Sequence, residues 1–288
     1  MKKISLIILC ILLALVLVGC SGGNDQSSNK KPQRNTDDNK GEEVDNTIVG
    51  LKEGWNDSNQ NDKAEKFFLP YRIYLPKDYS TDKKYPVLFF LHGNGSRGND
   101  NLSQMNNARI CDTLLADPNT SDIIIIAPQC SSDSAWVLHD AKTEGNYTMD
   151  KELSPYLAEA LNVFDYWCSK LSTDEDRYYL YGNSNGGHAC YDLMSRFPDK
   201  WAAAVIVAGC GDLAQADKIK DIPIWIHHGT TDTLVPYETS TKMVEALKQA
   251  GAGDNITLTP YEGEGHTIFN AVGLNRDVAN WLYEQKRK

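Results

Sequence analysis

The residue whose surroundings most clearly indicate chemistry is Ser184, at the centre of the segment GNSNG, residues 182–186. A β-prone run, Tyr178–Tyr181, precedes this segment, and a helix-like pattern starts within it at Gly186. The arrangement matches the G-x-S-x-G nucleophile elbow, a sharp strand-to-helix turn that exposes a serine hydroxyl at a sheet edge. Glycines two positions to either side avoid the clashes that side chains would make there. An ordinary glycine-rich turn is the alternative, but the flanking strand and helix favour a nucleophile.

A serine hydroxyl is a poor nucleophile unless a neighbouring base accepts its proton. Six histidines are available, and we predict that His266 is the base. It ends the segment EGEGH, in a loop between the last predicted strand and the final predicted helix, where it could reach a sheet edge. The other five have simpler interpretations: His92 and His228 as hydrogen-bonded structural residues, His227 as a strand residue facing away from His228, His188 as a packing or supporting residue, and His139 as a cleft residue.

An imidazole base needs a carboxylate to orient it. We predict Asp232, in the segment HGTTDTLVP, which leaves the penultimate predicted strand. Asp212 is the alternative acid, although its segment GCGD also fits a simple turn aspartate.

Backbone N–H groups must stabilise the oxyanion that forms when a serine attacks a carbonyl group. We assign one donor to Asn94, in the segment LHGNG after a predicted strand, and the other to Asn185, which follows the nucleophile. Because both donors are backbone groups, changing either side chain is expected to have little effect.

The elements that must position these residues follow from the apolar patterns. Several strand candidates are continuous apolar runs, which indicate a sheet covered on both faces. Helical patterns alternate with the strands, so we predict parallel pairing in a three-layer α/β fold. The strand candidates are 71–75, 87–91, 123–127, 178–181, 203–208, 222–226 and 256–260, and the helix candidates are 153–171, 186–196, 239–249 and 271–285.

From about Tyr71 onward, several segments in this order resemble the α/β-hydrolase superfamily: YRIYLPKDY, YPVLFFLHGNG, IIAPQC, YLYGNSNGG, HGTTDTLVP and EGEGHTIF. The chain order Ser184, Asp232, His266 is the nucleophile–acid–base order of that superfamily. Within it, the chain resembles secreted esterases related to polyhydroxybutyrate depolymerases and to feruloyl and acetyl-xylan esterases. The resemblance implies a mostly parallel central sheet with helices on both faces. It also implies that Trp136, after the strand at 123–127, contacts substrate.

We therefore expect a serine carboxylic ester hydrolase that requires no metal or cofactor. The resemblance implies a small-molecule or polysaccharide ester as substrate, with acyl or feruloyl esters of plant polysaccharide as the specific expectation. A serine peptidase of the prolyl-oligopeptidase type and a catalytically inactive binding lipoprotein are the alternatives.

The start of the chain has the pattern of an export signal. Lys2 and Lys3 precede an apolar run, residues 4–18, which is followed by Gly19 and Cys20. Its end resembles a bacterial lipobox, which implies that Cys20 is lipidated and anchors an exported protein to the outside of the cell membrane. A retained transmembrane helix is the alternative, although the run is shorter than the roughly 20 residues that a bilayer requires. We expect a signal peptide at 1–19, a flexible polar tether at 20–50 and one catalytic domain at 51–288.

The composition restricts the partners. The chain has 39 acidic and 29 basic residues, so nucleic acid is not an expected ligand. Five cysteines lie beyond the predicted anchor without C-x-x-C spacing, and we interpret them as buried small hydrophobes rather than zinc ligands. The sequence leaves open a disulfide among them: Cys111, Cys130, Cys168, Cys190 and Cys210.

Overall fold

A computed structural model describes residues 51–58, 67–139, 141 and 145–288 of the chain, all of which belong to one compact unit. The predicted signal peptide, the predicted lipidation site Cys20 and the predicted tether lie outside these residues. Within the described ranges, no helix has both the length and the apolar character needed to cross a bilayer.

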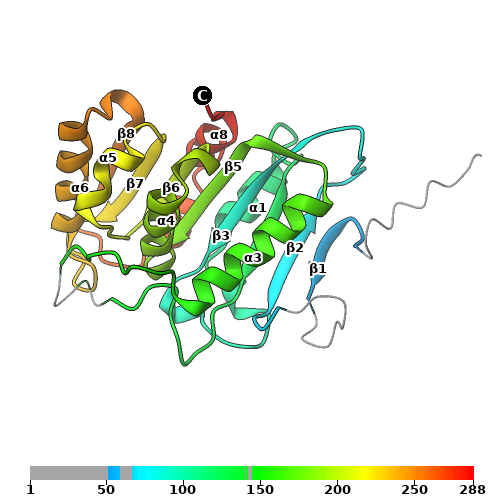
Figure 1. The fold of residues 1–288 in the computed structure, drawn as a ribbon, viewed down its shortest axis with the longest axis horizontal. Coiled ribbons are helices and arrows are strands. Elements are labelled where there is room, and N and C mark those ends of the chain that lie inside the picture. The colour runs from blue at the N-terminus through cyan, green and yellow to red at the C-terminus, as the bar shows by residue number, and fades with distance from the viewer. Residues whose placement is uncertain (1–50, 59–66, 140, 142–144) are drawn as a thin grey trace, which may run out of the picture. The chain divides into compact units, whose positions relative to one another are not determined.

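An eight-stranded sheet forms the centre of the unit, in the order β1-β2-β4-β3-β5-β6-β7-β8 (Figure 1). The pairs β1–β2 and β2–β4 are antiparallel, and all others are parallel. The strands are β1 (Gly54–Asp57), β2 (Tyr71–Leu75), β3 (Tyr85–Leu91), β4 (Ile124–Pro128), β5 (Thr173–Asn183), β6 (Ala203–Val207), β7 (Ile224–Gly229) and β8 (Ile256–Tyr261).

Helices cover both faces of the sheet, with α3 and α4 in front and α1 and α8 behind in the view of Figure 1. The helices are α1 (Arg109–Ala116), α3 (Pro155–Lys170), α4 (Asn185–Arg196), α5 (Ala216–Ile219), α6 (Tyr237–Ala250), α7 (Phe269–Gly273) and α8 (Arg276–Glu284). Short 3-10 turns occur at Asn94–Ser96, Ser103–Met105, Pro198–Lys200, Leu213–Gln215 and Gly253–Asn255. The predicted three-layer α/β architecture is confirmed.

Strand β3 shows why the sheet needs cover on both sides. Its alternate residues point to opposite faces, and Val87 and Phe89 join the hydrophobic cluster under α3 and α4. Leu88 and Phe90 join the cluster under α1 and α8. All seven residues of the strand are buried, as the continuous apolar run predicts.

The ends of the helices follow local chemistry. Ser154 caps α3 by accepting a hydrogen bond from the Leu157 N–H at 3.2 Å, and Pro155 occupies the first turn. Gly251 ends α6 at φ 97°, in the left-handed region that glycine adopts most readily.

All seven predicted strands are present, with small differences at their ends, but the final predicted helix at 271–285 is divided. Asn275 has extended backbone angles, and its side chain accepts a hydrogen bond from the Asp277 N–H at 2.9 Å, which starts α8 separately from α7. Strand β1 and helices α1 and α5 are additional. Strand β1 has no buried residue and α5 has only four residues, so neither gives a periodic signal.

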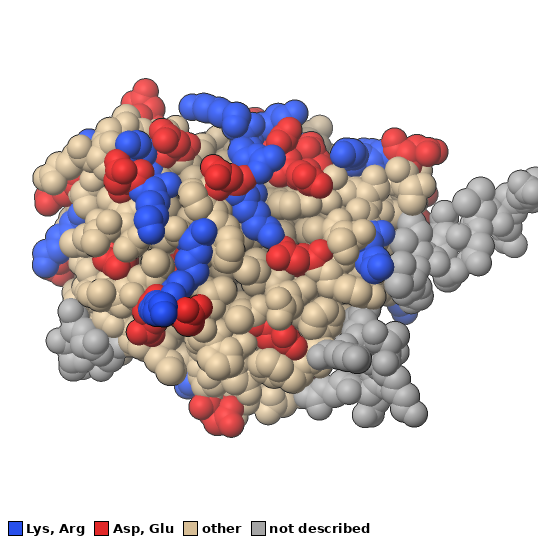
Figure 2. All heavy atoms as spheres, in the orientation of Figure 1, with Lys and Arg blue, Asp and Glu red and all other residues tan. Residues whose placement is uncertain are grey.

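The surface charges and the cysteines are distributed as follows. Acidic and basic side chains are intermixed over the face shown in Figure 2. The five cysteines of the described part are all free, and four of them are buried: Cys111, Cys130, Cys190 and Cys210.

Candidate active site

The predicted elbow forms at the carboxyl end of β5, where Ser184 connects the strand to α4. Its backbone has φ 52° and ψ −117°, an unusual combination for a residue with a side chain. The Ser184 N–H donates to the Val207 carbonyl at 2.7 Å, and the His188 N–H donates to the Ser184 carbonyl at 3.1 Å. The turn is thus held by β6 on one side and by the first turn of α4 on the other.

The elbow glycines are required for packing rather than for flexibility. A Cβ atom at Gly182 would lie 2.2 Å from the Gly186 carbonyl oxygen, and one at Gly186 would lie 1.9 Å from the Leu91 carbonyl oxygen. A Cβ at Gly93 would lie 3.2 Å from the Ser184 Cβ. The loop after β3 therefore passes directly beside the serine.

The structure brings the three predicted side chains into one hydrogen-bonded line. His266 Nε2 lies 2.8 Å from Ser184 Oγ, and His266 Nδ1 lies 2.6 Å from Asp232 Oδ2. A carboxylate can only accept, so Nδ1 carries the hydrogen and Nε2 is left to accept from the serine hydroxyl. This is the tautomer that a histidine base requires.

Neighbouring loops bring residues of distant sequence positions together. Strands β7 and β8 are adjacent and parallel, so the loops after them leave the same edge of the sheet. The Thr231 N–H donates to the Glu264 carbonyl at 2.9 Å, and a Cβ at Gly229 would lie 2.3 Å from the Gly265 carbonyl oxygen. This close backbone packing fixes Asp232 next to His266.

Four hydrogen-bond donors surround the Asp232 carboxylate. Oδ1 accepts from the N–H groups of Leu234 and Val235 at 2.8 and 2.9 Å. Oδ2 lies 2.6 Å from His266 Nδ1 and 3.2 Å from His228 Nε2. Burial alone would raise the pKa of Asp232, but the hydrogen bonds from the two histidines and Val235 outweigh it, and the pKa lies well below its ordinary value. The carboxylate is therefore ionised in the folded protein.

Ser184 and His266 line a pocket of about 770 Å³ at this edge of the sheet. The predicted oxyanion residues Asn94 and Asn185 line it too. Asn94 begins a 3-10 turn and Asn185 begins α4, and the first N–H groups of a helix have no partner within it. Both N–H groups are thus suitably placed donors. The wall combines further amide side chains with apolar ones, among them Asn107, Asn270, Leu234, Val235 and Phe269.

The Asn185 side chain has contacts that the sequence analysis did not predict. Its Oδ1 accepts from the N–H groups of Trp136 and Val137 at 2.9 and 3.3 Å, and its Nδ2 donates to the Val137 carbonyl at 2.7 Å. The side chain therefore fixes segment 136–137 beside the pocket. Asn94, by contrast, is exposed.

The prediction that Trp136 contacts substrate is contradicted. The residue is only 1% exposed, and its indole N–H donates to the His92 carbonyl at 2.9 Å. Its ring packs on the imidazole of His92, with centroids 5.1 Å apart. Trp136 lies behind the pocket wall because its loop turns the indole into the core rather than toward solvent.

The remaining candidates have the structural roles expected of them. The His92 imidazole accepts from the Cys130 N–H at 3.0 Å, and that of His188 accepts from the Cys210 N–H at 2.9 Å. His139 lines the pocket. Asp212 caps a 3-10 turn by accepting from the Ala214 N–H at 2.9 Å and does not contact His266.

Sequence reasoning missed two side chains that touch the line of residues. His228 contacts Asp232, and the Phe269 ring packs edge-on against the His266 imidazole, with centroids 5.4 Å apart. The separation of His228 from Asp232 by four residues across a strand end is the signal that could have indicated their contact.

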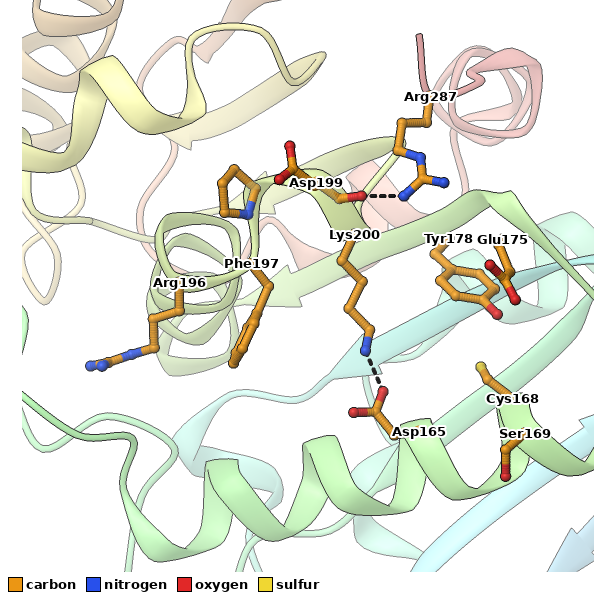
Figure 3. Close-up of a pocket in the computed structure, with 11 residues that line it drawn as sticks. Asp165, Cys168, Ser169, Glu175, Tyr178, Arg196, Phe197, Asp199, Lys200 and Arg287 are labelled. Atoms are coloured by element: carbon orange, nitrogen blue, oxygen red, sulfur yellow. Dashed lines mark hydrogen bonds and ion pairs between the residues drawn. The ribbon is translucent and has the colours of Figure 1, made fainter.

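A second pocket, of about 600 Å³, is lined by Glu175 and Tyr178 of β5 and by residues of neighbouring elements (Figure 3). Tyr178 precedes Ser184 by six residues, which is about 20 Å along a strand. Two of the pocket's cations have partners, because Lys200 pairs with Asp165 and Arg287 donates to the Asp199 carbonyl. Burial raises the pKa of the Cys168 thiol to about 12, so it is not a ready nucleophile. Within the described ranges, no group of three acidic, histidine or cysteine side chains is arranged to hold a metal ion.

Comparison with solved structures shows the same fold. A thermostable esterase superposes with a TM-score of 0.70 at 30% identity, over 81% of this chain and 63% of that one. A ferulic acid esterase from Anaeromyces mucronatus, in complex with ferulic acid, has a TM-score of 0.54 at 18% identity, over 81% of this chain and 90% of that one. An S-formylglutathione hydrolase from Staphylococcus aureus has a TM-score of 0.58 at 16% identity, over 80% of this chain and 96% of that one.

Comparison with protein-family models gives a match to the Esterase family over residues 69–267. The matched region spans more than half of the chain and includes Ser184, Asp232 and His266. The chain therefore belongs to the Esterase family, and its fold is that of an α/β-hydrolase.

Proposed function

We propose that this protein is a serine carboxylic ester hydrolase in which Ser184 is the nucleophile, His266 the base and Asp232 the orienting acid. The observation that carries the proposal is the unbroken hydrogen-bonded line from Ser184 Oγ through His266 to Asp232, with steps of 2.8 and 2.6 Å. A buried structural histidine would not need a strained, pocket-lining serine as its partner.

The reaction follows from this geometry. His266 Nε2 takes the hydroxyl proton as Ser184 Oγ attacks the ester carbonyl carbon, and the carbonyl oxygen becomes an oxyanion. The imidazolium returns that proton to the departing alcohol when the tetrahedral intermediate collapses to an acyl-enzyme. Water then loses a proton to His266, attacks the acyl carbon and releases the acid, which restores Ser184.

The oxyanion would be bound by the backbone N–H groups of Asn94 and Asn185. The N-terminus of α4 points toward the same site, so its dipole favours the developing negative charge. Loss of one such donor typically costs about 2.7–4 kcal/mol in the transition state. No step needs a group other than the side chains, the backbone and water.

For the substrate, we propose an acyl or feruloyl ester of plant polysaccharide. The support is the family membership, the similarity to a ferulic acid esterase and a pocket whose amide side chains suit a hydroxylated alcohol. Since Trp136 is buried, an aromatic acyl group would contact Phe269 instead.

We also propose that the enzyme is exported and anchored through a lipid on Cys20, on the strength of the sequence pattern at residues 2–20. Cell fractionation tests this: the protein should sediment with membranes and a Cys20→Ser variant should not. Equal recovery of both in the soluble fraction would count against the anchor.

The decisive experiment is the Ser184→Ala variant, assayed with p-nitrophenyl acetate, p-nitrophenyl butyrate, methyl ferulate and a prolyl p-nitroanilide peptide. We expect kcat for the esters to fall by roughly 10⁴-fold or more, because the nucleophile is lost while the pocket remains. Ser169→Ala, in the pocket of Figure 3, is the matched control and should retain wild-type turnover.

Each alternative function predicts a different result. Wild-type turnover by the Ser184→Ala variant would remove the nucleophile assignment. Faster cleavage of the anilide than of any ester would favour a serine peptidase, and ester binding without turnover would favour an inactive binding protein.

A further inference from the structure

A second imidazole contacts the carboxylate that orients His266. His228 Nε2 lies 3.2 Å from Asp232 Oδ2, the same oxygen that accepts from His266 Nδ1 at 2.6 Å. The side chains of His228 and Asp232 are both 0% exposed, so water does not compete for this contact. Oδ2 is therefore shared between two histidines, one in the line to Ser184 and one outside it.

The neighbours of His228 determine where its hydrogen lies. Its Nε2 is 2.9 Å from the Val235 carbonyl oxygen, which can only accept, so Nε2 carries a hydrogen. That N–H is directed between the Val235 carbonyl and the Asp232 carboxylate. On the other side of the ring, Nδ1 lies 2.6 Å from the Ser240 hydroxyl on α6. The ring is thus fixed at both nitrogens.

Few other ionisable groups face this pair. His188 and His139 lie across the pocket, and burial lowers the pKa of His188 to about 3, so that imidazole is neutral. The Tyr237 ring packs edge-on against His228, with centroids 5.8 Å apart, and burial and the nearby Glu262 raise its pKa. It is therefore un-ionised near neutral pH. His228 and His266 are the two imidazoles in contact with Asp232.

We propose that His228 is a positioning residue for catalysis, which holds the plane of the Asp232 carboxylate and shares its negative charge with His266. This inference rests on the proposed function, since it assumes that His266 is the base. The inference adds His228 to the three proposed catalytic side chains as a fourth residue, which acts through Asp232 and does not touch the substrate.

The proposed role has two physical consequences. The His228 N–H restrains rotation of the carboxylate, which keeps Oδ2 directed at His266 Nδ1. It also draws charge away from Oδ2, so the carboxylate holds the proton of the His266 imidazolium less tightly. The His228 N–H therefore influences the proton transfer from Ser184 to His266 through the carboxylate that they share.

The test compares three single variants in the pH dependence of kcat/KM for p-nitrophenyl acetate. His228→Asn keeps a polar group near Nδ1 but removes the group that reaches Asp232. His228→Gln places an amide N–H near Nε2. His227→Asn is the matched control, since His227 is the adjacent buried histidine on β7 and faces away from the site.

We expect the acidic limb of the His228→Asn profile to move to higher pH by about half a unit to one unit, since removing one donor from a carboxylate changes its pull on a neighbouring cation. Its plateau should fall on the order of tenfold, the rate equivalent of one hydrogen bond to a charged group. His228→Gln should restore the limb, and His227→Asn should leave it in place.

If His228 has a purely structural role, the kcat/KM profile of His228→Asn should have a lower plateau and an acidic limb at the wild-type pH. That result would overturn the proposal. So would an equal shift in the His228→Gln and His228→Asn variants. If His228→Asn does not fold by circular dichroism, Ser240→Ala replaces it, with a smaller shift in the same direction expected and an unmoved limb again contradicting the role. Ser184→Ala in the same assay separates the two proposals, because its full activity would remove the triad itself.

Discussion

At the scale of single residues, the site depends on one strained backbone conformation. Ser184 has a positive φ of 52°, which costs of order 1–3 kcal/mol for a residue with a Cβ atom. Gly182 and Gly186 allow the turn to pack tightly around this residue, because backbone atoms of the neighbouring turn and strand occupy the positions where their Cβ atoms would lie. The strain directs the hydroxyl out of the sheet toward His266.

The contact at Gly186 gives a residue-scale prediction. In a Gly186→Ala variant the new Cβ would meet the Leu91 carbonyl oxygen at 1.9 Å, and a backbone atom cannot move aside cheaply. We expect a loss of stability of about 3 kcal/mol or more and a loss of most ester turnover, measured by urea unfolding and by kcat.

Gly95→Ala is the matched control, because Gly95 lines the same pocket but a Cβ there would meet nothing within 4 Å. It should remain close to wild type in stability. If both variants unfold at the same urea concentration, the packing explanation of the elbow glycines is wrong.

At the scale of elements, the site is made from four loops at the carboxyl ends of parallel strands. The loop after β3 supplies Asn94, the turn after β5 supplies Ser184, and the loops after β7 and β8 supply Asp232 and His266. A fifth segment, 136–137 after β4, is fixed to this arrangement through the Asn185 side chain. Asn185 thus connects the oxyanion region to segment 136–137, which lies beside the pocket.

Replacing Asn185 by alanine tests this connection. The change leaves the buried N–H groups of Trp136 and Val137 and the Val137 carbonyl without their partner, at a cost of about 1–3 kcal/mol for each buried group. We expect lower stability and a kcat/KM reduced on the order of tenfold or more, because the wall moves relative to the oxyanion donors.

Asn94→Ala is the counterpart, since Asn94 is exposed and its proposed role belongs to the backbone N–H. Its kcat/KM should stay within about threefold of wild type. Equal effects of the two substitutions would show that the hydrogen bonds of the Asn185 side chain to segment 136–137 are not important for activity.

At the scale of the whole molecule, the two covered faces of the sheet bury imidazoles in their neutral form. Burial lowers the pKa of His92 to about 4, although its contact with Gly93 opposes the shift, and it lowers those of His188 and His227 to about 3. In the unfolded chain each would titrate near its ordinary value of 6.5. At pH values between 6.5 and these lowered pKa values, the unfolded chain binds more protons than the folded one.

The stability from these three groups is therefore present above about pH 6.5 and is lost as the pH falls toward 4. Linkage gives a loss of about 2 kcal/mol for each histidine between pH 7 and pH 5. Urea unfolding at the two pH values measures it. In the His227→Asn variant, the difference in unfolding free energy between the two pH values should be smaller by the contribution of one histidine. An unchanged difference would contradict the assignment of this pH dependence to the buried histidines.

Local sequence was sufficient for seven of the eight strands and for the three residues of the line. The apolar runs predict β3 and β4 because a strand covered on both faces needs apolar side chains on both. Ser184 is evident from its glycines, and His266 and Asp232 from their places in loops after the last two strands. The parallel order of the strands then requires these loops to meet at one edge.

Side-chain orientation could not be predicted in the same way. Trp136 was expected in the pocket, but its loop places the indole under His92. Asn185 was expected to contribute only its backbone, but its amide fixes segment 136–137. The sequence analysis also did not predict that His228 and His266 share one carboxylate oxygen.

The sequence by itself determined the fold class, the Ser184 elbow and the order of the three residues, because each depends on a short pattern whose physics is local. Only the tertiary structure decided which buried polar groups satisfy one another, because a hydrogen bond between residues 136 and 185, which are 49 positions apart in the chain, is a consequence of how loops pack. For residues 136 and 185, that packing buries the indole that was expected to contact substrate and hydrogen-bonds its segment to the Asn185 side chain.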